Sequence, residues 1–182
     1  TEFMGKISNY LEMIEDIKNK TPEKEAFCTG NSSLTYRELF LLVKEKQKKW
    51  KTAAKKELYF IQKEQALDQL TEFLTCQGMG YVPVILPMDM EEDKKTALIQ
   101  KFCAETKVPE EACMAVMTSG TSGENKLLFR TFESWYDYFP IQNEIFHITP
   151  ESRLFMQGSL AFTGNMNLYM AQLSAGATIL SE

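Results

Sequence analysis

The sequence predicts an α/β fold in which a mostly parallel sheet is flanked by helices. Short apolar runs that are typical of strands alternate with stretches whose apolar residues recur every three or four positions, which is the spacing of an amphipathic helix. The strand, helix and strand expected over residues 57–87 are long enough for a crossover between parallel strands. At 182 residues the chain has the length of one domain.

The first third of the chain predicts two helices around a short strand. Residues 5–20 place Ile7, Leu11, Ile14 and Ile17 at helical spacing, and Thr21-Pro22 ends that helix. Residues 25–28 form a short strand candidate, and residues 30–33 form a turn. The next helix opens at Thr35, because Glu38 three residues later completes a capping box.

The middle of the chain predicts the crossover unit. Residues 57–62 and 81–87 form its strands, and residues 66–77 form a helix with an apolar face made of Leu67, Leu70, Phe73 and Leu74. Pro83 lacks an N–H group, so we expect it at a strand start or a sheet edge. A further helix is expected over residues 91–106.

The last third predicts a second crossover. Residues 132–146 read as a helix that Pro140 bends or breaks, followed by a strand at 153–157. A loop over 158–165, a helix over 166–174 that stops at Gly176, and a strand over 177–180 complete the unit.

The most informative stretch is the loop at 117–126, Met-Thr-Ser-Gly-Thr-Ser-Gly-Glu-Asn-Lys, which joins apolar runs at 112–117 and 127–131. Glycines let a loop bring its amides close to an anion, hydroxyls donate further hydrogen bonds, and Lys126 adds a positive charge. This is the chemistry of phosphate binding. A P-loop is disfavoured because Asn125 precedes the lysine and Leu127 follows it, and no dinucleotide fingerprint or nucleophile elbow is present.

The loop resembles the signature of the adenylate-forming superfamily, Thr-Ser-Gly-Thr-Thr-Gly-x-Pro-Lys. Ser122 stands in place of a threonine, Asn125 in place of the proline, and Met117 where tyrosine is common. Two further stretches, 34–39 and 78–83, resemble other motifs of that superfamily in the same order. Members usually carry another strand and helix before the loop, so we expect a smaller sheet here. The resemblance covers residues 34–180.

The resemblance implies a reaction in which ATP activates a carboxylic acid as an acyl-adenylate and a thiol then takes the acyl group. The implied ligands are ATP and Mg²⁺, with CoA or carrier-protein phosphopantetheine as acceptor. The residues that would contact the phosphates are Thr118, Ser119, Gly120, Thr121, Ser122, Gly123 and Lys126. Residues 4–182 would be the N-terminal part of the AMP-binding domain, and residues 1–3 look like a cloning scar. The catalytic lysine and the Mg²⁺ ligand are expected beyond residue 182, so these residues alone should turn over little or nothing.

The resemblance also gives one indication of the substrate. Phe162, Thr163, Gly164 and Asn165 align with Phe-Asp-x-Ser of amino-acid-activating relatives, and Thr163 replaces the aspartate that pairs the substrate ammonium. Burying an unpaired ammonium is costly, which favours a plain acyl or aryl acid. For Phe162, Gly164 and Asn165, a packing aromatic followed by helix-start residues is an equally good interpretation. A non-catalytic nucleotide- or acyl-binding module on the same scaffold remains the alternative function.

Composition and charge indicate the partners and the cellular location to expect. A net charge of −5 argues against a nucleic-acid partner, and no run is apolar enough to cross a bilayer, so we expect a cytoplasmic protein. The lysine-rich residues 44–56 are expected to form a solvent-exposed helix end, and the alternative is a basic patch for CoA or membrane lipid. Four cysteines without C-x-x-C spacing favour free, mostly buried thiols, and the single histidine, His147, is expected to be partly buried. The sequence does not indicate an oligomeric state.

Overall fold

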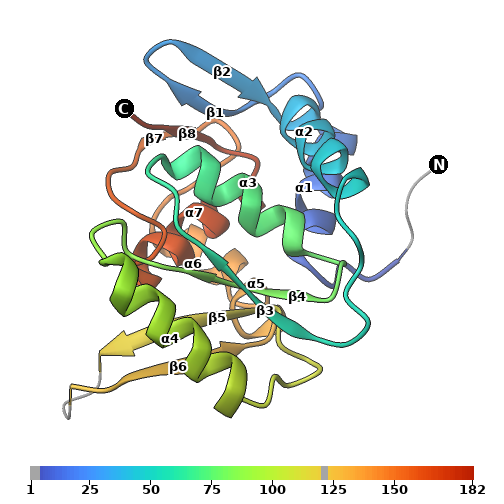
Figure 1. The fold of residues 1–182 in the computed structure, drawn as a ribbon. Helices are drawn as coiled ribbons and strands as arrows, with labels where there is room; N and C mark the ends of the chain where they lie inside the picture. The colour runs from blue at the N-terminus through green and yellow to red at the C-terminus, as the bar shows by residue number, and fades with distance from the viewer. Residues whose placement is uncertain (1–4, 120–122) are drawn as a thin grey trace.

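The structure is a computed structural model, which describes residues 5–119 and 123–182 (Figure 1). Helices and strands alternate along the chain, which confirms the predicted α/β class. The helices are α1 Tyr10–Lys20, α2 Tyr36–Lys48, α3 Ala66–Cys76, α4 Glu92–Glu105, α5 Glu133–Tyr136, α6 Phe139–Ile145 and α7 Thr163–Ser174. The strands are β1 Glu25–Thr29, β2 Ser32–Thr35, β3 Glu57–Ile61, β4 Tyr81–Ile85, β5 Met114–Ser119, β6 Asn125–Arg130, β7 Arg153–Phe155 and β8 Thr178–Leu180.

The described strands form three hydrogen-bonded groups and not one continuous sheet. A four-stranded sheet has the order β2-β1-β8-β7, in which β8 runs parallel to both neighbours and β1 and β2 are antiparallel. The strands β3 and β4 form a parallel pair, and β5 and β6 form an antiparallel hairpin. Both predicted crossovers therefore join parallel strands.

Pro83 lies in an edge strand, as its missing N–H group predicts. Its strand, β4, is hydrogen-bonded to β3 on one side. On the other side β5 runs beside β4 without a shared ladder in the described residues (Figure 1). The two pairs β3-β4 and β5-β6 thus lie in one layer although their hydrogen bonds do not connect them.

This layer separates two apolar clusters. On one face, Val82 and Val84 of β4 pack with Leu98 and Phe102 of α4. The opposite face belongs to the main core, to which β4 contributes Ile85. Alternate residues of a strand point to opposite faces, so one short apolar strand supplies both clusters.

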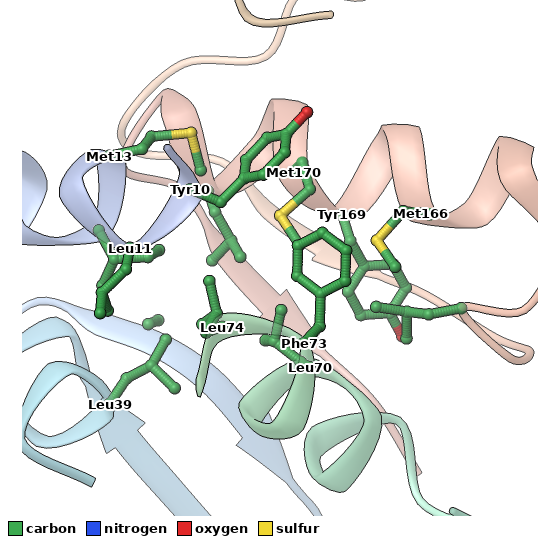
Figure 2. Close-up of a cluster of buried hydrophobic side chains, with 14 of the residues drawn as sticks. Tyr10, Leu11, Met13, Leu39, Leu70, Phe73, Leu74, Met166, Tyr169 and Met170 are labelled. Carbon is green, nitrogen blue, oxygen red and sulfur yellow. The ribbon is translucent and has the colours of Figure 1, made fainter. Parts of the chain in front are cut away.

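The main core is built chiefly by four helices. Figure 2 shows side chains of α1, α2, α3 and α7 converging, among them Tyr10, Leu39, Phe73 and Tyr169. The Tyr10 ring meets Phe132 edge-on, with ring centroids 4.9 Å apart. This cluster holds α3 and α7 against the layer that carries the hairpin.

Helix starts agree with the sequence where a capping side chain is present. Thr35 accepts a hydrogen bond from the Glu38 amide at 3.1 Å and Glu38 accepts one from the Thr35 amide at 3.0 Å, which confirms the capping box. The first helix begins at Tyr10 and not at Gly5, because the Asn9 side chain caps it by accepting from the Glu12 amide at 2.9 Å.

One predicted boundary near the candidate site is wrong. The segment 158–165 is not entirely a loop, because α7 begins at Thr163 and not at Met166. The Met166 amide donates to the Phe162 carbonyl at 3.0 Å, so the first helical turn closes over Thr163, Gly164 and Asn165.

None of the described helices combines the length and the apolar character that a bilayer span needs.

The four cysteines are free, as expected, but only Cys76 is fully buried and Cys103 is exposed. Burial raises the pKa of the Cys113 thiol to about 12 and also raises that of Cys76. Because the thiolate is the reacting species, iodoacetamide at pH 8 should modify Cys103 well before Cys113 or Cys76. Peptide mass spectrometry after timed alkylation measures this order, and in urea all four should react alike. Alkylation of native Cys113 as fast as Cys103 would contradict the prediction.

Candidate functional site

The predicted phosphate loop at 117–126 lies where β5 and β6 meet, but it is shorter than expected, because residues 117–119 belong to β5 and residues 125 and 126 to β6. The two strands pair in register from Met114 opposite Arg130 to Ser119 opposite Asn125, with Thr118 opposite Lys126. The strand-loop-strand context of the motif is therefore present. Gly120, Thr121 and Ser122 lie outside the described residues.

The hairpin register places Thr118 and Lys126 on the same face. Partners directly opposite in an antiparallel pair point to the same side of the sheet. Met117, Leu127 and Phe129 pack into the cluster under α4, so they occupy the other face. Thr118 and Lys126 consequently point away from α4, toward the side on which Met114 and Val116 meet the main core.

The β6 side of the tip is open to an incoming anion. Lys126 is exposed and makes no ion pair with any described residue. Gly123 has φ of 79°, and a Cβ added there would have no heavy atom within 4 Å. The glycine therefore adopts the left-handed backbone that the motif was expected to need, beside free space.

The second predicted region lies against this same face. Leu160, Ala161 and Met166 line a small cavity of about 10 Å³ together with Met114 and Val116 of β5. A space of this size holds about one water molecule. The tertiary structure thus brings the hairpin and the segment around residue 160 together, although some 40 residues separate them in the sequence.

The four predicted pocket residues follow that contact directly. Phe162 is 68% exposed, Thr163 and Gly164 are exposed, and Asn165 is half-buried in the first turn of α7. A larger hollow of about 560 Å³ lies elsewhere, between α5, α6 and the end of α7, and contains none of them.

Sequence reasoning passed over Gln69 of α3. This side chain is 1% exposed and accepts a hydrogen bond from the Leu160 amide at 2.8 Å. The available signal was its position four residues before Phe73, which places an amide on the apolar face of a predicted helix. A buried amide needs partners, so such a position indicates a backbone segment held nearby.

The base of the hairpin is fixed by other contacts. The Cys113 amide donates to the Arg130 carbonyl at 2.9 Å, and the Arg130 guanidinium lies 4.7 Å from the centre of the Trp135 ring.

His147 is exposed in a turn with φ of 56° and is not partly buried as expected. In the described residues, no three His, Cys, Asp or Glu side chains gather in a way that could hold a metal ion.

Comparison with known proteins gives the fold. No family model and no curated protein sequence match the chain. Solved structures do match: VinN in complex with L-aspartate has TM-score 0.77 and 14% identity over 96% of this chain and 57% of its own. The Klebsiella oxytoca NpsA N-terminal subdomain in complex with 3-hydroxybenzoyl-AMSN has TM-score 0.76 and 15% identity over 97% and 54%. The chain has the fold of the N-terminal domain of adenylate-forming enzymes.

A third solved structure that matches the chain contains ATP and magnesium. O-succinylbenzoate coenzyme A synthetase (MenE) from Bacillus subtilis, in complex with ATP and magnesium ion, matches with TM-score 0.73 and 14% identity over 96% of this chain and 57% of MenE. The chain therefore spans little more than half the length of these three proteins.

Proposed function

We propose that the chain is the N-terminal part of an ATP-dependent acid–thiol ligase of the acyl-CoA ligase type. The supporting observation is the placement of the motif hairpin, with Thr118 and Lys126 on the face that meets the segment around residue 160. The fold adds support, because one protein that shares it was solved with ATP and magnesium.

In the first step a substrate carboxylate oxygen attacks the α-phosphorus of ATP. The bond from that phosphorus to the bridging oxygen breaks, and pyrophosphate leaves with the electron pair. Negative charge grows on the pyrophosphate, so donors held in place around it stabilise the transition state. The donors in this proposal are the backbone and hydroxyl groups of Thr118, Ser119, Gly120, Thr121, Ser122 and Gly123.

Lys126 contributes a positive charge beside the phosphates. Its ammonium is exposed and has no carboxylate partner in the described part of the chain, so its charge is available to a ligand. Mg²⁺ would arrive with ATP and neutralise its phosphate oxygens. We propose no protein ligand for the metal among these residues.

In the second step a thiol sulfur attacks the acyl carbonyl carbon and AMP leaves. CoA and carrier-protein phosphopantetheine both supply such a thiol. The proposed acid is a plain acyl or aryl acid, with Phe162, Thr163, Gly164 and Asn165 beside it. Thr163 offers a hydroxyl where an amino-acid substrate would need a carboxylate to pair its ammonium.

A pyrophosphate-release assay on the full-length protein tests the proposal. The panel contains straight-chain acids from acetate to palmitate, substituted benzoates, and aspartate as an amino-acid comparison. We expect release with ATP and at least one acyl or aryl acid, and little with aspartate. Binding of ATP without release for any acid would support the non-catalytic module instead, and absence of ATP binding would remove both.

A further inference from the structure

Gln69 connects α3 to the segment that precedes α7. Its Oε1 accepts from the Leu160 amide at 2.8 Å, and its Nε2 donates to the Lys63 carbonyl at 2.8 Å. The Ser159 hydroxyl lies 3.1 Å from Nε2 and 3.4 Å from Oε1. The buried amide of Gln69 thus has partners for both its oxygen and its nitrogen, all of them in loops.

The segment it contacts is otherwise closed on itself. The Asn165 side chain donates to the Ser159 carbonyl at 3.1 Å, and the Ala161 amide donates to the Ser159 hydroxyl at 3.0 Å. Gly158 has φ of 98°, and a Cβ there would lie 2.7 Å from Asn165 Nδ2. This compact loop is therefore built to approach the start of α7 closely.

Among the described residues, Gln69 is the one side chain from another element that hydrogen-bonds residues 158–165. Its hydrogen bonds therefore tie the loop to α3, in addition to the apolar packing of Leu160 in the core. Leu160 is 2% exposed, so without Gln69 its amide would be buried and unpaired.

We propose that Gln69 is a positioning residue for acid binding, which it serves by holding the Ser159-Leu160 peptide. This inference rests on the proposed function, because residues 162–165 are proposed to contact the acid. The held peptide sets the direction in which the chain enters α7. It also sets the distance between Ala161 and Val116, which line the same small cavity beneath the hairpin face.

A methionine at position 69 would fill nearly the same volume, so packing alone does not call for glutamine. The amide is needed because the loop presents a buried N–H group and a hydroxyl at this point. A purely structural role would lower stability when the amide is lost and leave substrate binding unchanged. A positioning role would also weaken acid binding.

The first test is amide hydrogen exchange at Leu160 in the full-length protein, comparing Gln69→Met with the unaltered protein. We expect faster exchange at Leu160 by about tenfold, from the loss of a hydrogen bond of typical strength. Thr75→Val is the matched control. It removes an equally buried bond in the same helix, from the Thr75 hydroxyl to the Thr71 carbonyl at 2.6 Å, and should leave Leu160 exchange unchanged. Unchanged exchange in Gln69→Met would overturn the proposal.

The second test measures KM in the full-length enzyme with the best acid of the pyrophosphate panel. Gln69→Met should raise KM for the acid about tenfold and leave KM for ATP and kcat within about twofold. Ser159→Ala, a milder change, should raise KM for the acid less, and Thr75→Val should not raise it. An active Gln69→Met enzyme with an unchanged KM for the acid would remove the role of Gln69 alone. A wild-type enzyme inactive with every acid would remove the proposed function, and this role with it.

Discussion

Lys126→Ala in the full-length protein is expected to weaken ATP binding by about 1.5–3 kcal/mol, the range of a hydrogen bond to a charged group. That corresponds to a rise in Kd of about 10- to 150-fold. The reason is that the ammonium lies free on the hairpin face beside the proposed phosphate site. Isothermal titration calorimetry with ATP and Mg²⁺ measures the change.

The control for Lys126→Ala is Lys101→Ala, which removes an exposed lysine from α4 and should leave the Kd for ATP unchanged. The two variants lower the net charge equally, so a general electrostatic effect would appear in both. If Lys126→Ala binds ATP and forms adenylate as the wild type does, Lys126 does not belong to the site.

Phe73→Ala is expected to lower the free energy of unfolding by about 3–5 kcal/mol. Phe73 is 1% exposed, lies 5.6 Å from the Tyr10 ring centre, and also lines the small cavity under β5 (Figure 2). Stability would be lost because less apolar surface is buried and because the substitution leaves a cavity among the four helices. Urea unfolding followed by circular dichroism measures it, and an effect this large is a sizeable fraction of typical domain stability.

Phe146→Ala is the comparison for Phe73→Ala. Phe146 is 59% exposed, so its removal should change the free energy of unfolding by no more than about 0.5 kcal/mol. Equal losses in the two variants would mean that Phe73 is not part of the core that the structure describes.

Local patterns were sufficient for much of the fold. The capping box at Thr35 and Glu38, the positive φ at Gly123 and the break before α6 at Pro140 each depend on residues a few positions apart. Such features depend little on the rest of the fold, because their interacting groups are neighbours in sequence. The hairpin was predictable because its two strands adjoin one short loop, and both parallel crossovers were predictable from the helix between their strands.

Boundaries and long-range contacts were less predictable. The start of α7 depends on a helical turn that no side chain caps, so the sequence carried no marker for Thr163. Whether His147 and Cys103 are exposed depends on how the helices and strands pack around them, and both are exposed. The division of the strands into three groups depends on how edges meet in space.

The amino-acid order alone determined the class of the fold, the hairpin with its hydroxyls, glycines and lysine, and the elements around it. These follow from periodicity and turn chemistry, which act over a few residues. Only the tertiary structure decided that the hairpin face meets residues 160–166 and that Gln69 of α3 holds that segment. These contacts join groups about 40 and about 90 residues apart, and their geometry is set by the packing of the whole core.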